Sequence, residues 1–110
     1  MSALPIDILH EPARAALLLH PTRRRVLELL APPHEPDSAS GVARTLKLPR
    51  QKINYHLREL EDAGLVEHVE DRRKGNCVER IVRATATTYL ISPEALGALG
   101  ASSVDAQDRF

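Results

Sequence analysis

The chain has 110 residues, a length that supports one small domain and is too short for a second one. Its 15 basic and 15 acidic side chains cancel, so the net charge alone argues against a protein that binds polyanions. Aromatic residues make up 3% of the chain and tryptophan is absent, which predicts a core of Leu, Val, Ile and Ala.

The single cysteine, Cys77, excludes an internal disulfide and fits a reducing compartment. No apolar run approaches the length of a membrane span. The first residues carry no basic segment ahead of their apolar part, which argues against a signal peptide. We therefore expect a cytoplasmic protein with no membrane partner.

The N-terminal part of the chain predicts an arm and two helices. We expect a flexible arm over residues 1–10 and a folded domain over residues 11–100. Pro12 suits a first helical position, and Pro21 ends that helix and opens the next one. The run Leu17–Leu19 is wider than one helix face requires, and core burial and a dimer contact explain it equally well.

A pair of helices is predicted between Ser38 and about Ala63, joined by a tight turn at 47–49. Ser38 suits the N-cap of the first helix, and Pro49 presets the first turn of the second, which begins at Pro49 or Arg50. At a helical step of about 100°, the apolar residues fall on one stripe of each helix. The stripes contain Ala39, Val42, Ala43 and Leu46 in the first helix and Ile53, Leu57 and Leu60 in the second.

The opposite face of the second helix is unusual for a solvated surface, which is mostly Glu and Lys. It carries Gln51, Asn54, Tyr55 and Arg58, flanked by Arg50 and Lys52. Amides and arginines at such a spacing reach base edges in a DNA major groove, the amides suiting adenine and the arginines guanine. We therefore predict that this helix binds double-stranded DNA.

Positive charge is concentrated in two stretches. Five basic residues and no acid lie between Arg44 and Arg58, and five basic residues against Glu79 lie between Arg72 and Arg83. A nucleic-acid footprint needs this kind of local field rather than a high net charge.

The second basic stretch reads as a hairpin. Apolar residues of two strands flank Gly75-Asn76, which suits a two-residue turn. Arg72, Arg73 and Lys74 at its tip predict a wing that contacts DNA phosphates. Charge that merely protects a strand edge is the alternative, but it would predict mixed signs.

The C-terminal part begins with residues 84–91, which are rich in β-branched side chains and predict an extended segment. Ser92 and Pro93 then suit the start of a short helix that Gly100 ends. We expect residues 101–110 to be a disordered tail.

Taken together, the segments HPTRRRVLELL (His20–Leu30) and GVARTLKLPRQKINYHLRELEDAGLVE (Gly41–Glu67), followed by a charged hairpin, resemble the ArsR-like bacterial transcription regulators. The resemblance covers about residues 13–91. It implies a winged helix-turn-helix fold, mainly α with a small β-hairpin, in which the second helix of the pair is the recognition helix. It also implies repression, because a homodimer bound over a promoter blocks polymerase. Lys47 stands where the family frequently has Gly.

Some members of that family hold a metal, and this chain departs from both of their patterns. A soft-metal site needs several thiolates, and Cys77 is alone; the alternative site needs C-terminal histidines, and none follows His68. His56 lies beside the buried stripe and is expected to be a packed histidine. We expect no metal, no cofactor and, in the absence of a catalytic motif, no enzyme activity.

Two other functions stay open at this stage. The near-zero net charge and the acids Glu59, Glu61 and Asp62 at the end of the second helix would suit a winged-helix module that binds protein instead of DNA. Alternatively, the chain is the DNA-binding part of a sensor whose ligand site lies elsewhere.

Overall fold

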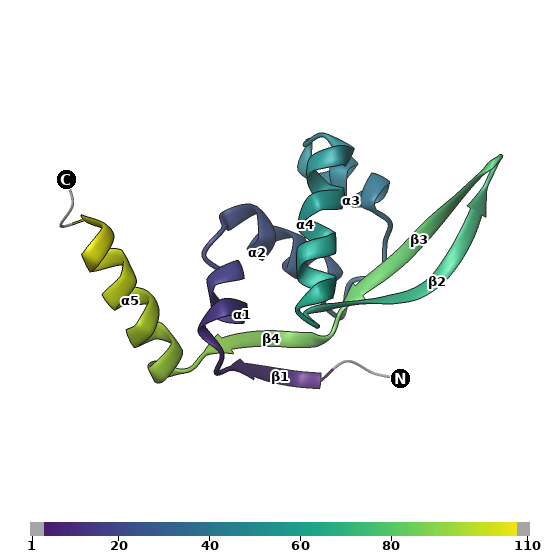
Figure 1. Cartoon of the computed structure of the whole chain (residues 1–110). Helices are drawn as coiled ribbons and strands as arrows, with labels where there is room; N and C mark the ends of the chain where they lie inside the picture. The colour runs from purple at the N-terminus through teal and green to yellow at the C-terminus, as the bar shows by residue number, and fades with distance from the viewer. Residues whose placement is uncertain (1–3, 108–110) are drawn as a thin grey trace.

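The computed structural model describes the backbone of residues 4–107 and the side chains of residues 4–100. Helices form the body of the molecule, and a long β-hairpin projects from it (Figure 1). In chain order the elements are β1 (Leu4–Leu9), α1 (Pro12–Leu17), α2 (Pro21–Leu30), α3 (Ala39–Leu46), α4 (Arg50–Asp62), β2 (Val66–Lys74), β3 (Cys77–Ala84), β4 (Ala86–Ile91) and α5 (Pro93–Gln107). Within this part of the chain, no helix combines the length and the apolar character that a bilayer span requires.

The predicted helix pair is confirmed as α3 and α4. The Ser38 hydroxyl accepts a hydrogen bond from the Gly41 N–H at 3.1 Å, and Pro49 precedes the first residue of α4. Gly64 has a φ of 76° and ends α4 in the left-handed region that glycine tolerates. Lys47 caps α3 with a φ of 58°, which is also in the left-handed region. A residue with a β-carbon adopts this conformation at a higher free-energy cost than glycine does.

The core is aliphatic, as the composition predicts, and it fixes α4 in place. Ile53 and Leu60 are fully buried on α4, and they join Leu30 of α2 and Val42 of α3 in one cluster. Leu65, which follows α4, is also fully buried. The apolar stripe thus turns the polar side of α4 outward.

The predicted wing is confirmed as the antiparallel hairpin β2–β3. Its two strands are joined by the two-residue turn Gly75–Asn76, with a φ of 62° at Gly75. The register shifts between His68 and Glu70, which marks a bulge near the base of the hairpin.

The expected flexible arm is wrong for most of its length. Leu4–Leu9 forms β1 and pairs in parallel with β4, with Ile8 opposite Leu90. Leu9 is fully buried, and Arg14 donates a hydrogen bond to the Asp7 carboxylate at 3.3 Å. The partner strand lies some eighty residues further along the chain, so a local sequence pattern could not reveal it. Residues 1–3 lie outside the described residues.

The C-terminal helix is longer than the sequence predicts. Ser92 caps it by accepting a hydrogen bond from the Ala95 N–H at 3.1 Å, but α5 continues past Gly100 to Gln107. A glycine inside a helix costs only about 1 kcal/mol and ends it only where the backbone turns left-handed. The expected disordered tail is therefore helical over 101–107, and residues 108–110 lie outside the described residues.

Candidate nucleic-acid interface

The six residues predicted for the recognition helix all lie on the exposed side of α4. Their positions lie between those of the buried stripe, so their side chains point away from the core, and Tyr55 is 56% exposed. The six are Arg50, Gln51, Lys52, Asn54, Tyr55 and Arg58. None of the three basic residues makes an ion pair within the described residues, so their charge faces solvent.

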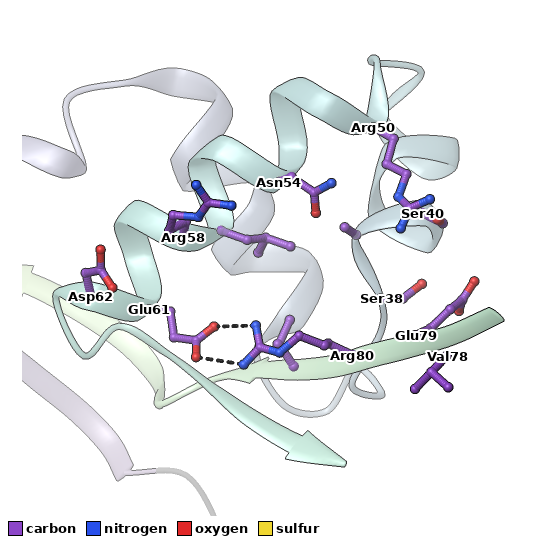
Figure 2. Close-up of a pocket in the computed structure, with 13 residues that line it drawn as sticks. Ser38, Ser40, Arg50, Asn54, Arg58, Glu61, Asp62, Val78, Glu79 and Arg80 are labelled. Carbon is purple, nitrogen blue, oxygen red and sulfur yellow. Dashed lines mark hydrogen bonds and ion pairs between the residues drawn. The ribbon is translucent and has the colours of Figure 1, made fainter. Parts of the chain in front are cut away.

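A groove of about 460 Å³ separates α4 from the wing. Arg50, Asn54 and Arg58 line one wall, and Figure 2 shows them following one another along the helix. The other wall comes from β3 and includes Val78 and Arg80. The helix face and the wing therefore border the same concave surface, which is the arrangement that one DNA duplex can contact with both elements.

The three predicted wing residues are exposed, but they are not equivalent. Strand alternation places Arg73 on one face of β2 and Arg72 and Lys74 on the other. Arg72 lies 3.6 Å from the Glu70 carboxylate, whereas Arg73 and Lys74 make no ion pair among the described residues. Arg73 and Lys74 are thus the more available cations.

The buried side of α4 holds a polar contact that the sequence did not reveal. His56 is only 3% exposed, as expected for a packed histidine, and its Nδ1 accepts a hydrogen bond from Arg23 Nε at 3.2 Å. The His20 ring lies edge-on with its centroid 4.6 Å away. His56 Nε2 is buried and has no hydrogen-bond partner in the described part of the chain.

This environment favours the neutral imidazole. Burial lowers the pKa of His56 below its ordinary value of 6.5, and the nearby His20, Arg23 and Lys52 lower it further against the opposing effect of Glu59. Protonation would also remove the acceptor that Arg23 uses.

A second unpredicted contact joins α4 to the wing. The two terminal guanidinium nitrogens of Arg80, Nη1 and Nη2, donate to the Glu61 carboxylate at 3.0 and 2.9 Å. The Arg80 guanidinium lowers the pKa of Glu61, although partial burial opposes this shift. The two residues are 19 positions apart, and only the folded hairpin brings them together.

The described residues contain no group of three or more His, Cys, Asp or Glu side chains close enough to hold a metal ion. Cys77 is exposed at the first position of β3.

Comparisons with known proteins agree with this geometry. The family described as "Helix-turn-helix domain" matches residues 18–69. No curated protein matches the chain. Among solved structures, an ArsR-like transcriptional regulator from Rhodococcus sp. RHA1 is 29% identical, with a TM-score of 0.50 over 88% of this chain and 72% of that one. A protein of Mycobacterium tuberculosis is 27% identical, with a TM-score of 0.51 over 86% of this chain and 83% of that one.

A third neighbour shares the fold at lower identity. It is a homodimeric winged helix-turn-helix DNA-binding domain from Mycobacterium bovis, described as a possible ArsR-family transcriptional regulator. It is 20% identical, with a TM-score of 0.52 over 87% of this chain and 77% of that chain.

The helix pair, the wing and these matches define a winged helix-turn-helix protein. Within that class the chain is similar to the DNA-binding transcription regulators of the ArsR type. The resemblance and the fold class predicted from the sequence are both confirmed.

The neutral His56 predicts that acid destabilises the protein. Its folded-state pKa is lowered, so the unfolded chain binds more protons, and the free energy of unfolding should fall as the pH drops below 6.5. Urea unfolding at several pH values between about 7.5 and about 5.5 measures this slope. His56→Gln should flatten it, whereas His34→Gln, at an exposed position, should leave it unchanged. Equal slopes in wild type and His56→Gln would contradict the assignment.

Proposed function

We propose that this protein is a repressor that binds a specific double-stranded DNA site as a homodimer in the cytoplasm. The observation that carries the proposal is the exposed face of α4, where Asn54, Arg50 and Arg58 border a groove shared with the wing. Neither arginine makes an ion pair among the described residues. Repression follows because a dimer bound over a promoter blocks access of the polymerase.

The recognition helix would supply the base contacts. Gln51 and Asn54 suit adenine, and Arg50 or Arg58 suits guanine, each good bidentate pair contributing about 1–3 kcal/mol of discrimination. Tyr55 would lie in the major groove of the DNA, and Lys52 would bind a DNA phosphate. The wing would bind phosphates of the DNA backbone through Arg72, Arg73 and Lys74. Arg72 would contribute least, because the Glu70 carboxylate lies beside it.

Two helices support the dimer. α5 packs against α1 and then projects away from the body (Figure 1), and a lone helix of this length is marginal in water. Leu19, which follows α1, and Leu96 of α5 are 50% and 56% exposed. A second copy that covers these helices would bury both leucines. It would also place two recognition helices on half-sites about one DNA turn apart.

The protein-binding alternative loses one of its supports. It relied on the acids at the end of α4, yet Glu61 is engaged by Arg80 rather than offered to a partner.

Selection from a pool of random duplexes tests the function. We expect enrichment of two inverted half-sites, and Asn54→Ala should relax the preference at one base position of each half-site. The affinity for random DNA should change little in that variant, because phosphate contacts supply most of it. Thr45→Ala, at an exposed position on α3, serves as the control. Absence of binding even at low salt, where phosphate attraction is strongest, would contradict the proposal.

The wing predicts a salt dependence. Replacing Arg73 and Lys74 by Gln should weaken binding to all sequences. It should also reduce the steepness of the slope of log affinity against log salt concentration by up to about 1.8, since each lost phosphate contact reduces the slope by about 0.9. The matched variant, Arg24→Gln with Arg25→Gln, removes the same charge from exposed positions on α2. It should keep the wild-type slope, and an equal loss in both variants would refute a specific role for the wing.

A further inference from the structure

We infer that Glu61 and Arg80 are positioning residues for DNA recognition, because their ion pair holds the wing at a fixed place beside the recognition helix. The inference rests on the proposed function, since it concerns how two DNA-contacting elements are kept in register.

The geometry of the pair is suited to fixing orientation as well as distance. Arg80 Nη1 donates to one carboxylate oxygen of Glu61 at 3.0 Å, and Nη2 donates to the other at 2.9 Å (Figure 2). Two parallel hydrogen bonds restrain the planes of both groups, which a single contact does not. Glu61 and Arg80 keep 30% and 57% of their side chains exposed, so the pair lies at the surface of the groove.

The two ends of this contact have different rigidity. Glu61 is on the last turn of α4, next to the fully buried Leu60, so the helix provides a fixed anchor. Arg80 lies on β3 where the hairpin leaves the body. Ile81 and Val82 beside it are 2% exposed, whereas Val78 toward the tip is 59% exposed. The ion pair therefore restrains the wing at the boundary between its buried base and its free tip.

The pair also determines which cations are available to DNA. Arg80 is paired with Glu61 and lies opposite Asp71 on the neighbouring strand. Its charge is therefore less available to a DNA phosphate than the charge of Arg73 near the tip. With the pair intact, β3 keeps a constant offset from Asn54 and Arg58 across the groove. Arg73 and Lys74 on the paired strand β2 then keep a constant offset as well. A wing released from α4 would still bind phosphates, but of any sequence, because its offset from the base contacts would vary. The pair thus acts on specificity more than on total affinity.

The position of the wing can be measured without DNA. Cys77 is the only cysteine and is exposed on the wing, so one spin label can be attached there and a second at Arg44→Cys, on the exposed side of α3. We expect a narrow distribution of label distances in the otherwise wild-type chain and a broader one in Glu61→Gln and Arg80→Gln. Asp62→Asn, which makes the same charge change one residue later, should keep the narrow distribution. An unchanged distribution in Glu61→Gln would overturn the inference.

Specificity is the second readout. Each single variant should lower the ratio of affinities for the selected duplex and for random DNA by about two- to fivefold, the range expected for a partly exposed pair. The double variant should lose no more than either single one, and the charge swap Glu61→Arg with Arg80→Glu should recover part of the ratio.

The two readouts separate this inference from the proposed function. Should the wild type prefer a site and the variants keep the full ratio, the inference is overturned and the repressor function stands. If the wild type shows no site preference while the label distances still broaden, the repressor function fails and the structural role of the pair stands.

Discussion

Burial of one side of α4 is the constraint on which the rest of the structure depends. Ile53 and Leu60 are fully removed from solvent against helices α2 and α3, and this fixes the rotation of α4 about its axis. The amides and basic residues between the buried positions of α4 must then face outward. The same core continues through Leu65 into the hairpin, so one apolar cluster positions both the recognition helix and the base of the wing.

Charge pairing explains how a chain with no net charge can serve a DNA-binding role. Several acids are paired with basic residues of the same chain: Asp7 with Arg14, Glu67 with Arg83, and Glu61 with Arg80. The basic residues on the exposed face of α4 have no such partners within the described residues. Net charge counts paired and unpaired groups equally, whereas the local field beside α4 depends mainly on the groups without a partner.

Local signals explain what the sequence could predict. Pro49 and Gly64 bound α4, and the stripe of apolar residues identifies its buried side, so the recognition helix and its exposed face were predictable. The pairing of β1 with β4 and the contact between Glu61 and Arg80 join residues that are far apart in sequence, and no local pattern encodes them. The length of α5 is not predictable from the local pattern, because Gly100 indicates a helix end although its backbone stays helical.

The most direct test of the account is a titration of isotope-labelled protein with duplex DNA, followed residue by residue by nuclear magnetic resonance. The account predicts that the largest shift changes fall on the exposed face of α4, at Asn54 and Arg58 among others, and on the wing at Arg73. Residues of β1 and β4 should change little. Changes confined to β1, β4 or α5, or no changes at low salt, would contradict the claim that α4 and the wing together bind DNA.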